Sequence, residues 1–172
     1  MRRHRILTYI ALVLTTALLL SLTACDGTTF GSSVPRLRVN IRLDLRQSSF
    51  VTFTPENTYA YVTATRKGFY LNGEYAAPAL DTDYFGYGGV VIYVNMLGGY
   101  DAYDMACPYC ASRGYAHTCE INKSNNTSAV CPVCGEEYQL WSGTGIPTKG
   151  ITREPLLRLP LTVTDNYIIV RQ

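Results

Sequence analysis

The 172-residue sequence predicts an all-β fold, and three observations support this prediction. Residues 37–45 alternate strictly between apolar and polar side chains, which is typical of a strand with one buried face. The chain contains 14 Tyr and 14 Gly, a composition that favours strands and tight turns. No segment shows a convincing helical pattern.

The first 25 residues have the three regions of an export signal in order. Arg2, Arg3 and Arg5 form a basic start, and the apolar stretch at 6–20 is too short for a confident membrane-spanning helix. The following Leu-Thr-Ala-Cys at 22–25 resembles the lipobox of bacterial lipoproteins, whose Cys is diacylated and becomes the mature N-terminus. We therefore predict a signal peptide at residues 1–24, lipidation at Cys25, and an exported protein anchored to a bacterial membrane, in the periplasm or cell envelope. An ordinary signal peptide is the alternative.

Removal of the signal changes the charge of the chain. Residues 1–24 contain three of the 15 Lys and Arg residues and none of the 13 Asp and Glu residues, so the mature chain has a net charge of −1. Nucleic-acid binding depends on clustered Lys and Arg, so this composition does not favour it. The remaining 148 residues suffice for one domain with its own core.

The predicted elements follow a small polar segment. We expect residues 25–35 to form the lipidated N-terminus and a flexible tether, and residues 36–172 to form the domain. The first strand spans residues 36–46, whose four Arg residues are expected to be a solvated face rather than an anion site. Further strands are predicted within these segments: 48–55, 58–66, 68–71, 88–105, 137–143, 156–163 and 167–172, with an Asn-Gly hairpin turn at 72–73.

Five cysteines follow Cys25, and four of them form a Cys-x2-Cys-x20-Cys-x2-Cys pattern. The four are Cys107, Cys110, Cys131 and Cys134. A Cys-x-x-Cys turn places two thiolates on the same side of a tight loop, and two such loops form a tetrahedral cage of four sulfurs. Zinc fits this cage, and so does iron, alone or in a cluster.

Disulfides are the alternative for these four cysteines, because the compartment outside the cytoplasm is oxidising. Pro residues within both turns favour metal ligation over disulfides. Cys119 is left as a spare thiol, a disulfide partner or an alternative ligand. His117, two residues before it, is expected to be a surface residue rather than a ligand.

The residues around the two cysteine pairs resemble the Rieske-type ferredoxin domain over roughly residues 90–172. In that family, a Cys-x-His turn and a Cys-x-x-His-Gly turn hold a two-iron, two-sulfur cluster. The second turn is followed by an aromatic residue, a loop with Gly and Pro, a Pro-Leu pair and a closing hairpin. The matching residues are Cys107, Cys131, Gly135, Tyr138, Gly143, Gly145 and Pro155-Leu156. The resemblance implies a Rieske-like antiparallel β-sandwich with a small two-loop metal-binding subdomain, whose loops span residues 105–138.

The sequence departs from the family at both histidine positions, which are Tyr109 and Cys134 here. Cys110 is the better fourth ligand, so the His-ligated Rieske centre, and with it high-potential electron transfer, is not expected. Three states remain open: a structural zinc, an all-Cys two-iron cluster of low potential, and a metal-free, disulfide-held interaction module of the cell envelope. Zinc is slightly favoured because it is redox-inert in an oxidising compartment. A redox or envelope partner is not specified, and enzymatic activity is less favoured because no nucleophile–base pair is recognisable.

Overall fold

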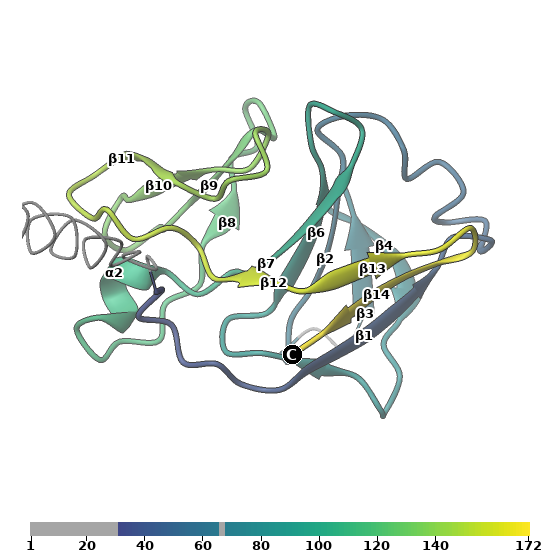
Figure 1. Ribbon diagram of the computed structural model, residues 1–172, viewed down its shortest axis with the longest axis horizontal. Helices are drawn as coiled ribbons and strands as arrows, with labels where there is room; N and C mark the ends of the chain where they lie inside the picture. Colours follow the sequence, from purple (N-terminus) through teal and green to yellow (C-terminus); the bar gives the residue numbers. More distant parts are fainter. Residues whose placement is uncertain (1–30, 66–67) are drawn as a thin grey trace, which may run out of the picture. The chain divides into compact units, whose positions relative to one another are not determined.

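The computed structural model describes residues 31–65 and 68–172 (Figure 1). The predicted signal peptide and Cys25 lie outside these residues. Apart from one four-residue helix, the regular elements of the described residues are all strands, which confirms the predicted fold class. Its elements are β1 (Val39–Asp44), β2 (Tyr59–Val62), β3 (Gly68–Leu71), β4 (Glu74–Pro78), β5 (Tyr84–Phe85), β6 (Val90–Val94), β7 (Tyr100–Asp104), α2 (Pro108–Ala111), β8 (Glu120–Ile121), β9 (Ser128–Val130), β10 (Glu137–Gln139), β11 (Pro147–Lys149), β12 (Arg158–Leu159), β13 (Leu161–Val163) and β14 (Tyr167–Arg171).

The strands form three antiparallel sheets. The outer sheet has the order β13-β14-β1-β5, the central sheet has the order β12-β7-β6-β2-β3-β4, and the small sheet has the order β11-β10-β9-β8. In Figure 1 the small sheet and α2 lie at one end of the domain, and the outer sheet lies at the other. The small sheet and α2 together carry the two loops that contain Cys107, Cys110, Cys131 and Cys134.

The first predicted strand is confirmed as β1, which pairs with the last strand of the chain. Leu43 lies opposite Ile168 in the β1–β14 ladder. Val39, Ile41 and Leu43 are buried, whereas Arg42 between them is exposed. The apolar face of β1 therefore packs into the main core, and the outward face is solvated as expected.

Strand β6 is buried on both faces and joins the two cores of the domain. Val90, Ile92 and Val94 belong to the main core between the outer and central sheets. Val91 and Tyr93 belong to a second core, which also contains the buried cysteines. Because successive side chains of a strand point to opposite faces, one strand serves both cores. Its continuous apolar sequence follows from this double burial.

Two sequence predictions differ from the structure. Residues 48–55 form turns rather than a strand, because Phe50 and Phe53 are both buried through successive tight turns, while Val51 is exposed. The turn that contains Cys110 is a single helical turn, α2, although no helix was expected. Pro108 occupies the first helical position. It lacks the N–H that the start of a helix leaves unpaired, and its φ is already helical, so it favours this four-residue helix.

The hairpin turn at Asn72-Gly73 is confirmed. Both residues have positive φ, at 50° and 91°, and they join β3 to β4. This conformation matches the twist of a two-residue hairpin and is the reason for the Asn-Gly sequence.

The domain begins before residue 36. Ser33 donates hydrogen bonds from its N–H and its hydroxyl to the carboxylate of Glu154, and Val34 is buried in the main core. These two residues, assigned to the tether from the sequence, contact the domain. Within the described residues, no helix has the length and apolar character needed to span a bilayer.

Candidate metal centre

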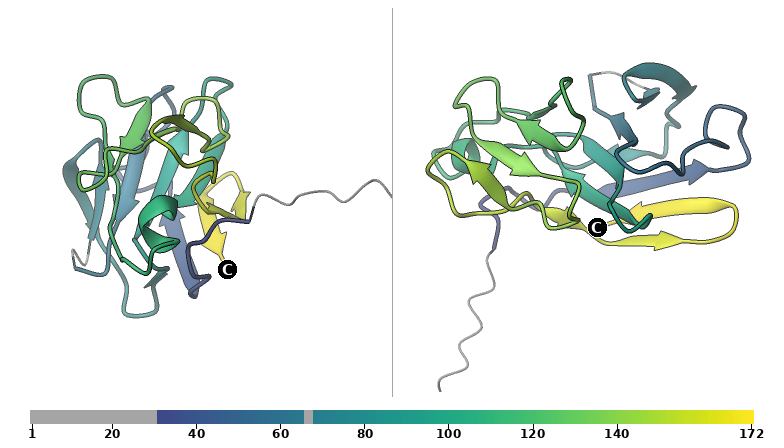
Figure 2. Two further views of the ribbon diagram at one scale, coloured as in Figure 1. Left: turned by 90° about the vertical axis from the view of Figure 1, so that its left-hand side faces the viewer. Right: turned by 90° about the horizontal axis from the view of Figure 1, so that it is seen from above.

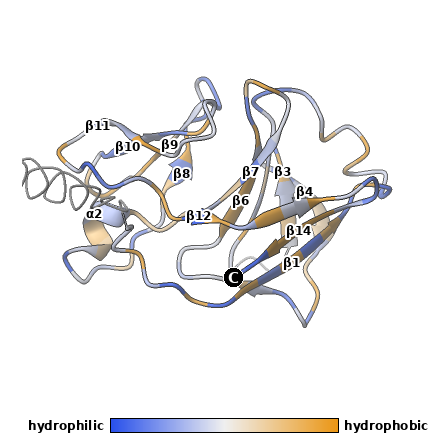
Figure 3. Ribbon diagram, viewed as in Figure 1, coloured by the Kyte–Doolittle hydropathy of each residue, from blue (hydrophilic) through white to orange (hydrophobic). Residues whose placement is uncertain are grey.

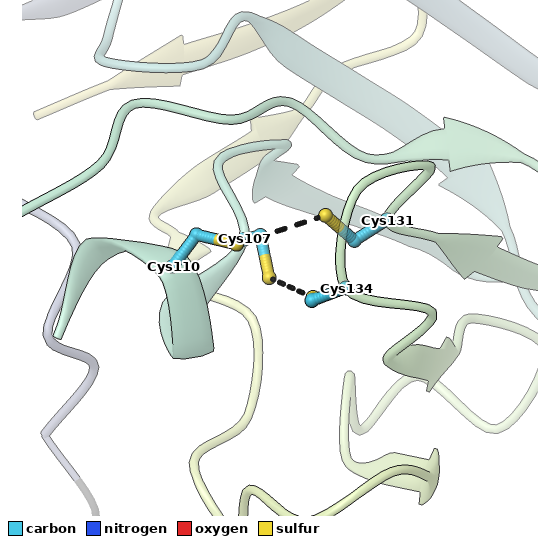
Figure 4. Close-up of side chains that lie close together, drawn as sticks. All are labelled: Cys107, Cys110, Cys131 and Cys134. Carbon is cyan, nitrogen blue, oxygen red and sulfur yellow. Dashed lines mark hydrogen bonds between the residues drawn. The ribbon is translucent and has the colours of Figure 1, made fainter. Parts of the chain in front are cut away.

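The structure brings four cysteine side chains together at the end of the domain that carries α2 (Figure 4). Cys107 and Cys110 come from the first loop, and Cys131 and Cys134 come from the second. Their Sγ atoms all lie within 4.8 Å of one another. Within the described ranges, this is the one group of three or more His, Cys, Asp or Glu side chains arranged to hold a metal ion.

The first loop is held by hydrogen bonds on both sides of Cys107. The Cys107 N–H donates to the carbonyl of His117, and the Ala111 N–H donates to the carbonyl of Cys107. The loop therefore leaves an extended segment and closes at once into α2, which places Cys110 beside Cys107.

A buried carboxylate fixes the chain just before this loop. Asp104 is 1% exposed, and its oxygens accept hydrogen bonds from the backbone N–H groups of Tyr87, Gly88 and Ala106 at 2.7, 2.8 and 2.9 Å. The carboxylate thereby ties the start of the first loop to the segment before β6.

The second loop is a tight turn that requires a glycine. Gly135 has φ +74° and donates its N–H to the Cys131 carbonyl at 2.9 Å, while the Cys131 N–H donates to the Glu136 carbonyl at 2.9 Å. A positive φ is unfavourable for residues with a Cβ, so Gly135 permits the sharp exit from the turn. The turn then leads directly into β10.

The two cysteine pairs face each other crosswise. Cys107 Sγ lies 3.6 Å from Cys134 Sγ, and Cys110 Sγ lies 3.9 Å from Cys131 Sγ. All five described cysteines are free thiols, and these distances greatly exceed a disulfide bond of about 2.05 Å. The arrangement is a compact set of four sulfur donors.

The cluster accommodates one negative charge without a cation. The hydrogen bond from Cys119, supported by one from Tyr138, lowers the pKa of Cys107 to about 4 despite burial. Burial and the neighbouring thiols raise the pKa of Cys134 to about 11, and burial raises the pKa of Cys110 as well. One thiolate therefore suppresses ionisation of its neighbours, and a divalent cation would reverse this effect.

Two hydrogen-bond donors to Cys107 have roles that sequence reasoning did not identify. The Tyr138 hydroxyl lies 3.4 Å from Cys107 Sγ. The Cys119 thiol lies near this sulfur, lowers its pKa, and is itself 3% exposed. Cys119 reaches the cluster because its N–H donates to the Met105 carbonyl, which pairs this segment with the start of the first loop. Such contacts depend on pairing between distant segments and leave no local signal.

Glu136 fixes the loop that follows β11. Its carboxylate is 2% exposed and accepts hydrogen bonds from the N–H groups of Ile151 and Thr152. Gly150 has φ +115°, and a Cβ there would lie 2.1 Å from the Glu136 carboxyl carbon. A glycine is therefore required for the carboxylate to approach the backbone.

Comparisons with known proteins identify structural neighbours only. No family model and no curated protein match the chain. The plasma membrane Rieske protein PetC3 from Synechocystis PCC 6803 is 26% identical, with 49% of this chain and 78% of that protein covered and a TM-score of 0.39. A ferredoxin from Sphingomonas yanoikuyae B1 is 18% identical, with 49% and 74% covered and a TM-score of 0.34. The ferredoxin of carbazole 1,9a-dioxygenase from Nocardioides aromaticivorans IC177 is 13% identical, with 78% and 95% covered and a TM-score of 0.39.

The chain is similar to Rieske-type proteins. This similarity agrees with the resemblance inferred from the sequence. All three TM-scores lie below 0.5, so the function proposed below rests on the cysteine geometry of this chain.

The residues present do not fit a His-ligated Rieske centre, which needs two imidazoles on one iron. His117 is the one histidine among the described residues, and its ring stacks on Tyr115 rather than joining the sulfur cluster. Tyr109, at the first histidine position of the family, lies under the guanidinium of Arg113 at 4.1 Å. The side chains that the structure brings together here are four cysteine thiols, which could hold a metal ion.

Proposed function

We propose that this chain is an exported, membrane-anchored lipoprotein whose Rieske-like domain holds one zinc ion on Cys107, Cys110, Cys131 and Cys134. The role of the ion is structural. The observation that carries this proposal is the compact crosswise arrangement of four Sγ atoms, all within 4.8 Å of one another.

The sulfur separations favour a single ion over a two-iron cluster. A tetrahedral ion with Zn–S bonds of about 2.3 Å has S–S edges of about 3.8 Å. The contacts of 3.6 and 3.9 Å lie on either side of this value. In a two-iron cluster, two cysteines bind each iron and bridging sulfides separate the irons, so cysteines on different irons lie farther apart.

The surroundings of the sulfurs also support a metal-bound state. Zinc with four thiolates carries a net charge of −2, which is costly to bury without hydrogen-bond donors. Cys107 is the more buried cysteine of the Cys107–Cys134 pair. The Tyr138 hydroxyl lies 3.4 Å from its sulfur, and Cys119 and Tyr138 both lower its pKa. Such outer donors orient metal ligands and stabilise their charge.

A structural ion would link the two cysteine loops of this fold. The two loops are separated by 20 residues and share the second core with β6, β7 and β10. When bound, zinc supplies four strong bonds between the loops, and its binding free energy adds to the stability of the folded state. The subdomain would then be held in place by both packing and metal ligation.

Low-potential electron transfer is the second candidate function. Four cysteine sulfurs also bind iron, either alone or in a cluster, and hydrogen bonds to the sulfurs set the reduction potential. The donors from Tyr138 and Cys119 suit this role as well. A metal-free module held by disulfides is the remaining alternative.

Elemental analysis combined with an absorption spectrum of the purified full chain separates these states. We expect one zinc per chain and no visible absorption. Visible bands with one iron and no sulfide, or with two irons and acid-labile sulfide, would replace zinc by an iron centre. No metal together with one titratable thiol per chain, that of Cys119, would establish the disulfide alternative.

The proposed anchor is tested separately by the Cys25→Ser variant. A lipidated wild-type chain should fractionate with membranes and carry a diacylated Cys25 detectable by mass spectrometry. The variant should lose the acyl chains, which each contribute about 0.8 kcal/mol per buried methylene to anchoring. An unmodified Cys25 in the wild-type chain would contradict the lipoprotein proposal.

A further inference from the structure

The outward face of the outer sheet carries most of a basic surface that the metal site does not use. Arg42 projects from β1 and Arg171 from β14, and Arg171 lies opposite Asn40 on the same face. Arg38 precedes β1 in the same alternation, and Arg46 follows β1. All four arginines are exposed. We refer to these four residues as the arginine face.

Tyrosine rings hold three of these guanidinium groups against the sheet. The Arg38 Cζ lies 4.0 Å from the ring centroid of Tyr84. The Cζ atoms of Arg42 and Arg46 lie 3.8 and 5.0 Å from the ring centroid of Tyr167. Cation–π contacts of this kind leave the N–H groups of the guanidinium free at the rim for phosphate oxygens. The resulting surface combines fixed positive charges with amphipathic aromatic rings.

Positive charge dominates on the strands of this face. Asp44 is its one acidic side chain, and it is paired with Arg46 through hydrogen bonds of 2.9 and 2.8 Å. Arg38, Arg42 and Arg171 form no ion pair among the described residues. Other acids, Asp81, Asp83 and Asp165, lie in the adjoining loops. Three arginines therefore remain available to an anionic partner.

The short link to Cys25 argues for a membrane as that partner. In Figures 1 and 2, the first described residues lie at the end of the domain that carries α2, and the chain then runs along the domain into β1. Ser33 and Val34 are fixed to the domain there. Cys25 lies only eight residues before Ser33, so a lipid on Cys25 would hold the domain within about 30 Å of the bilayer.

We propose that the arginine face binds the surface of an anionic phospholipid bilayer. The face is charge-complementary to phosphate headgroups, and Tyr84 and Tyr167 suit the interfacial layer. The orientation of the domain rests on the proposed lipidation of Cys25, whereas the binding itself does not. The zinc centre would then lie at the end of a domain whose outer sheet faces the membrane.

Vesicle binding by residues 31–172 tests this proposal without the lipid anchor. This unit has both cores and pairs its first strand with its last, so it is expected to fold alone. It contains 12 basic and 12 acidic residues, so net charge does not draw it to anionic vesicles. We expect cosedimentation with phosphatidylcholine vesicles that contain phosphatidylglycerol, no binding to pure phosphatidylcholine, and loss of binding at high salt.

Two triple variants with the same charge change provide the decisive comparison. Arg38→Gln, Arg42→Gln and Arg171→Gln together should weaken binding at least about tenfold, since each basic residue near an anionic surface contributes about 1 kcal/mol. The control is a triple variant at exposed residues outside the outer sheet: Lys123→Gln, Lys149→Gln and Arg153→Gln. It should bind vesicles like the parent protein. Circular dichroism and thermal unfolding establish whether both variants are folded. If the Gln variant is misfolded, a triple Arg→Lys variant at the same positions keeps the charge and should retain binding.

Several outcomes would overturn the proposal. These are the absence of binding to anionic vesicles, equal loss in the two triple variants, and binding that is retained in the Arg→Gln variant. Binding to duplex DNA but not to vesicles would assign the face to a different polyanion. Failure of Cys25 lipidation in cells would leave the vesicle result unaffected, so the two proposals fail independently.

Discussion

Cys107 Sγ lies 3.6 Å from Cys134 Sγ, although 26 residues separate the two cysteines in the chain. The first cysteine of one loop thus faces the second cysteine of the other. Cys110 and Cys131 form the matching contact at 3.9 Å. In this crosswise arrangement each sulfur contacts a sulfur of the other loop. The removal of any one of them should therefore weaken metal binding at the whole site.

The Cys134→Ser variant should lose most of its zinc and unfold at a lower temperature. A serine hydroxyl is a poor ligand for zinc at neutral pH, and the metal contributes to folding free energy. The matched control is Val133→Ser, one residue earlier in the same turn, whose side chain is 62% exposed. Metal content and thermal unfolding should be unchanged in the control. A Cys134→Ser protein with full metal content would exclude Cys134 as a ligand.

Removal of the donors to Cys107 should weaken metal binding without abolishing it. Tyr138→Phe deletes the hydroxyl that lies 3.4 Å from the sulfur, and Cys119→Ala deletes the thiol that lowers its pKa. Losses of about 10- to 100-fold in affinity are typical of such partners. Competition with a chromophoric chelator measures the affinity. Tyr115→Phe, on an exposed side chain, is the control. Affinities equal to that of the parent would show that these contacts do not support the ligand.

Metal binding should strengthen as the pH rises. At pH 7 in the metal-free protein, Cys107 is ionised because its pKa is lowered to about 4, whereas Cys110 and Cys134 are protonated because their pKa values are raised. Zinc binds thiolates, so at least these two protons must leave on binding. Affinity should rise about 100-fold per pH unit between roughly pH 6 and 8, and fall correspondingly on acidification. Chelator competition across this range that gives less than one proton per zinc would contradict the ligand assignment.

Asp104→Asn should destabilise the domain by about 2 kcal/mol or more, because an amide replaces a buried carboxylate oxygen and leaves a backbone N–H without its acceptor. Urea unfolding measures the change. Asp81→Asn, at an exposed loop position, should have little effect. A similar stability for both variants would mean that the three hydrogen bonds do not fix the first loop.

The strands with a clear period were predictable from the sequence. The alternation in β1, the Asn-Gly turn at 72–73 and the apolar run of β6 each depend on local chemistry alone. Residues 48–55 were predicted wrongly because Phe50 and Phe53 are buried by tight turns rather than by a strand face. Composition cannot distinguish these two routes to burial.

The four clustered cysteines were likewise predictable, because Cys-x-x-Cys turns orient two sulfurs by local geometry. The contacts of Cys119 and Tyr138 with Cys107 were not predicted, since they arise from pairing between Cys119 and Met105 and from the position of β10. The arginine face was predictable in part. Alternation predicted the exposure of its residues on β1, but only the fold shows that Arg38, Arg42 and Arg171 have no carboxylate partner within residues 31–65 and 68–172.

X-ray absorption at the zinc edge of the purified full chain tests the central claim most directly. A single zinc held by Cys107, Cys110, Cys131 and Cys134 predicts four sulfur neighbours at about 2.3 Å and no metal–metal scattering. Fewer than four sulfurs, an iron centre in place of zinc, or a second metal within the same cage would contradict it.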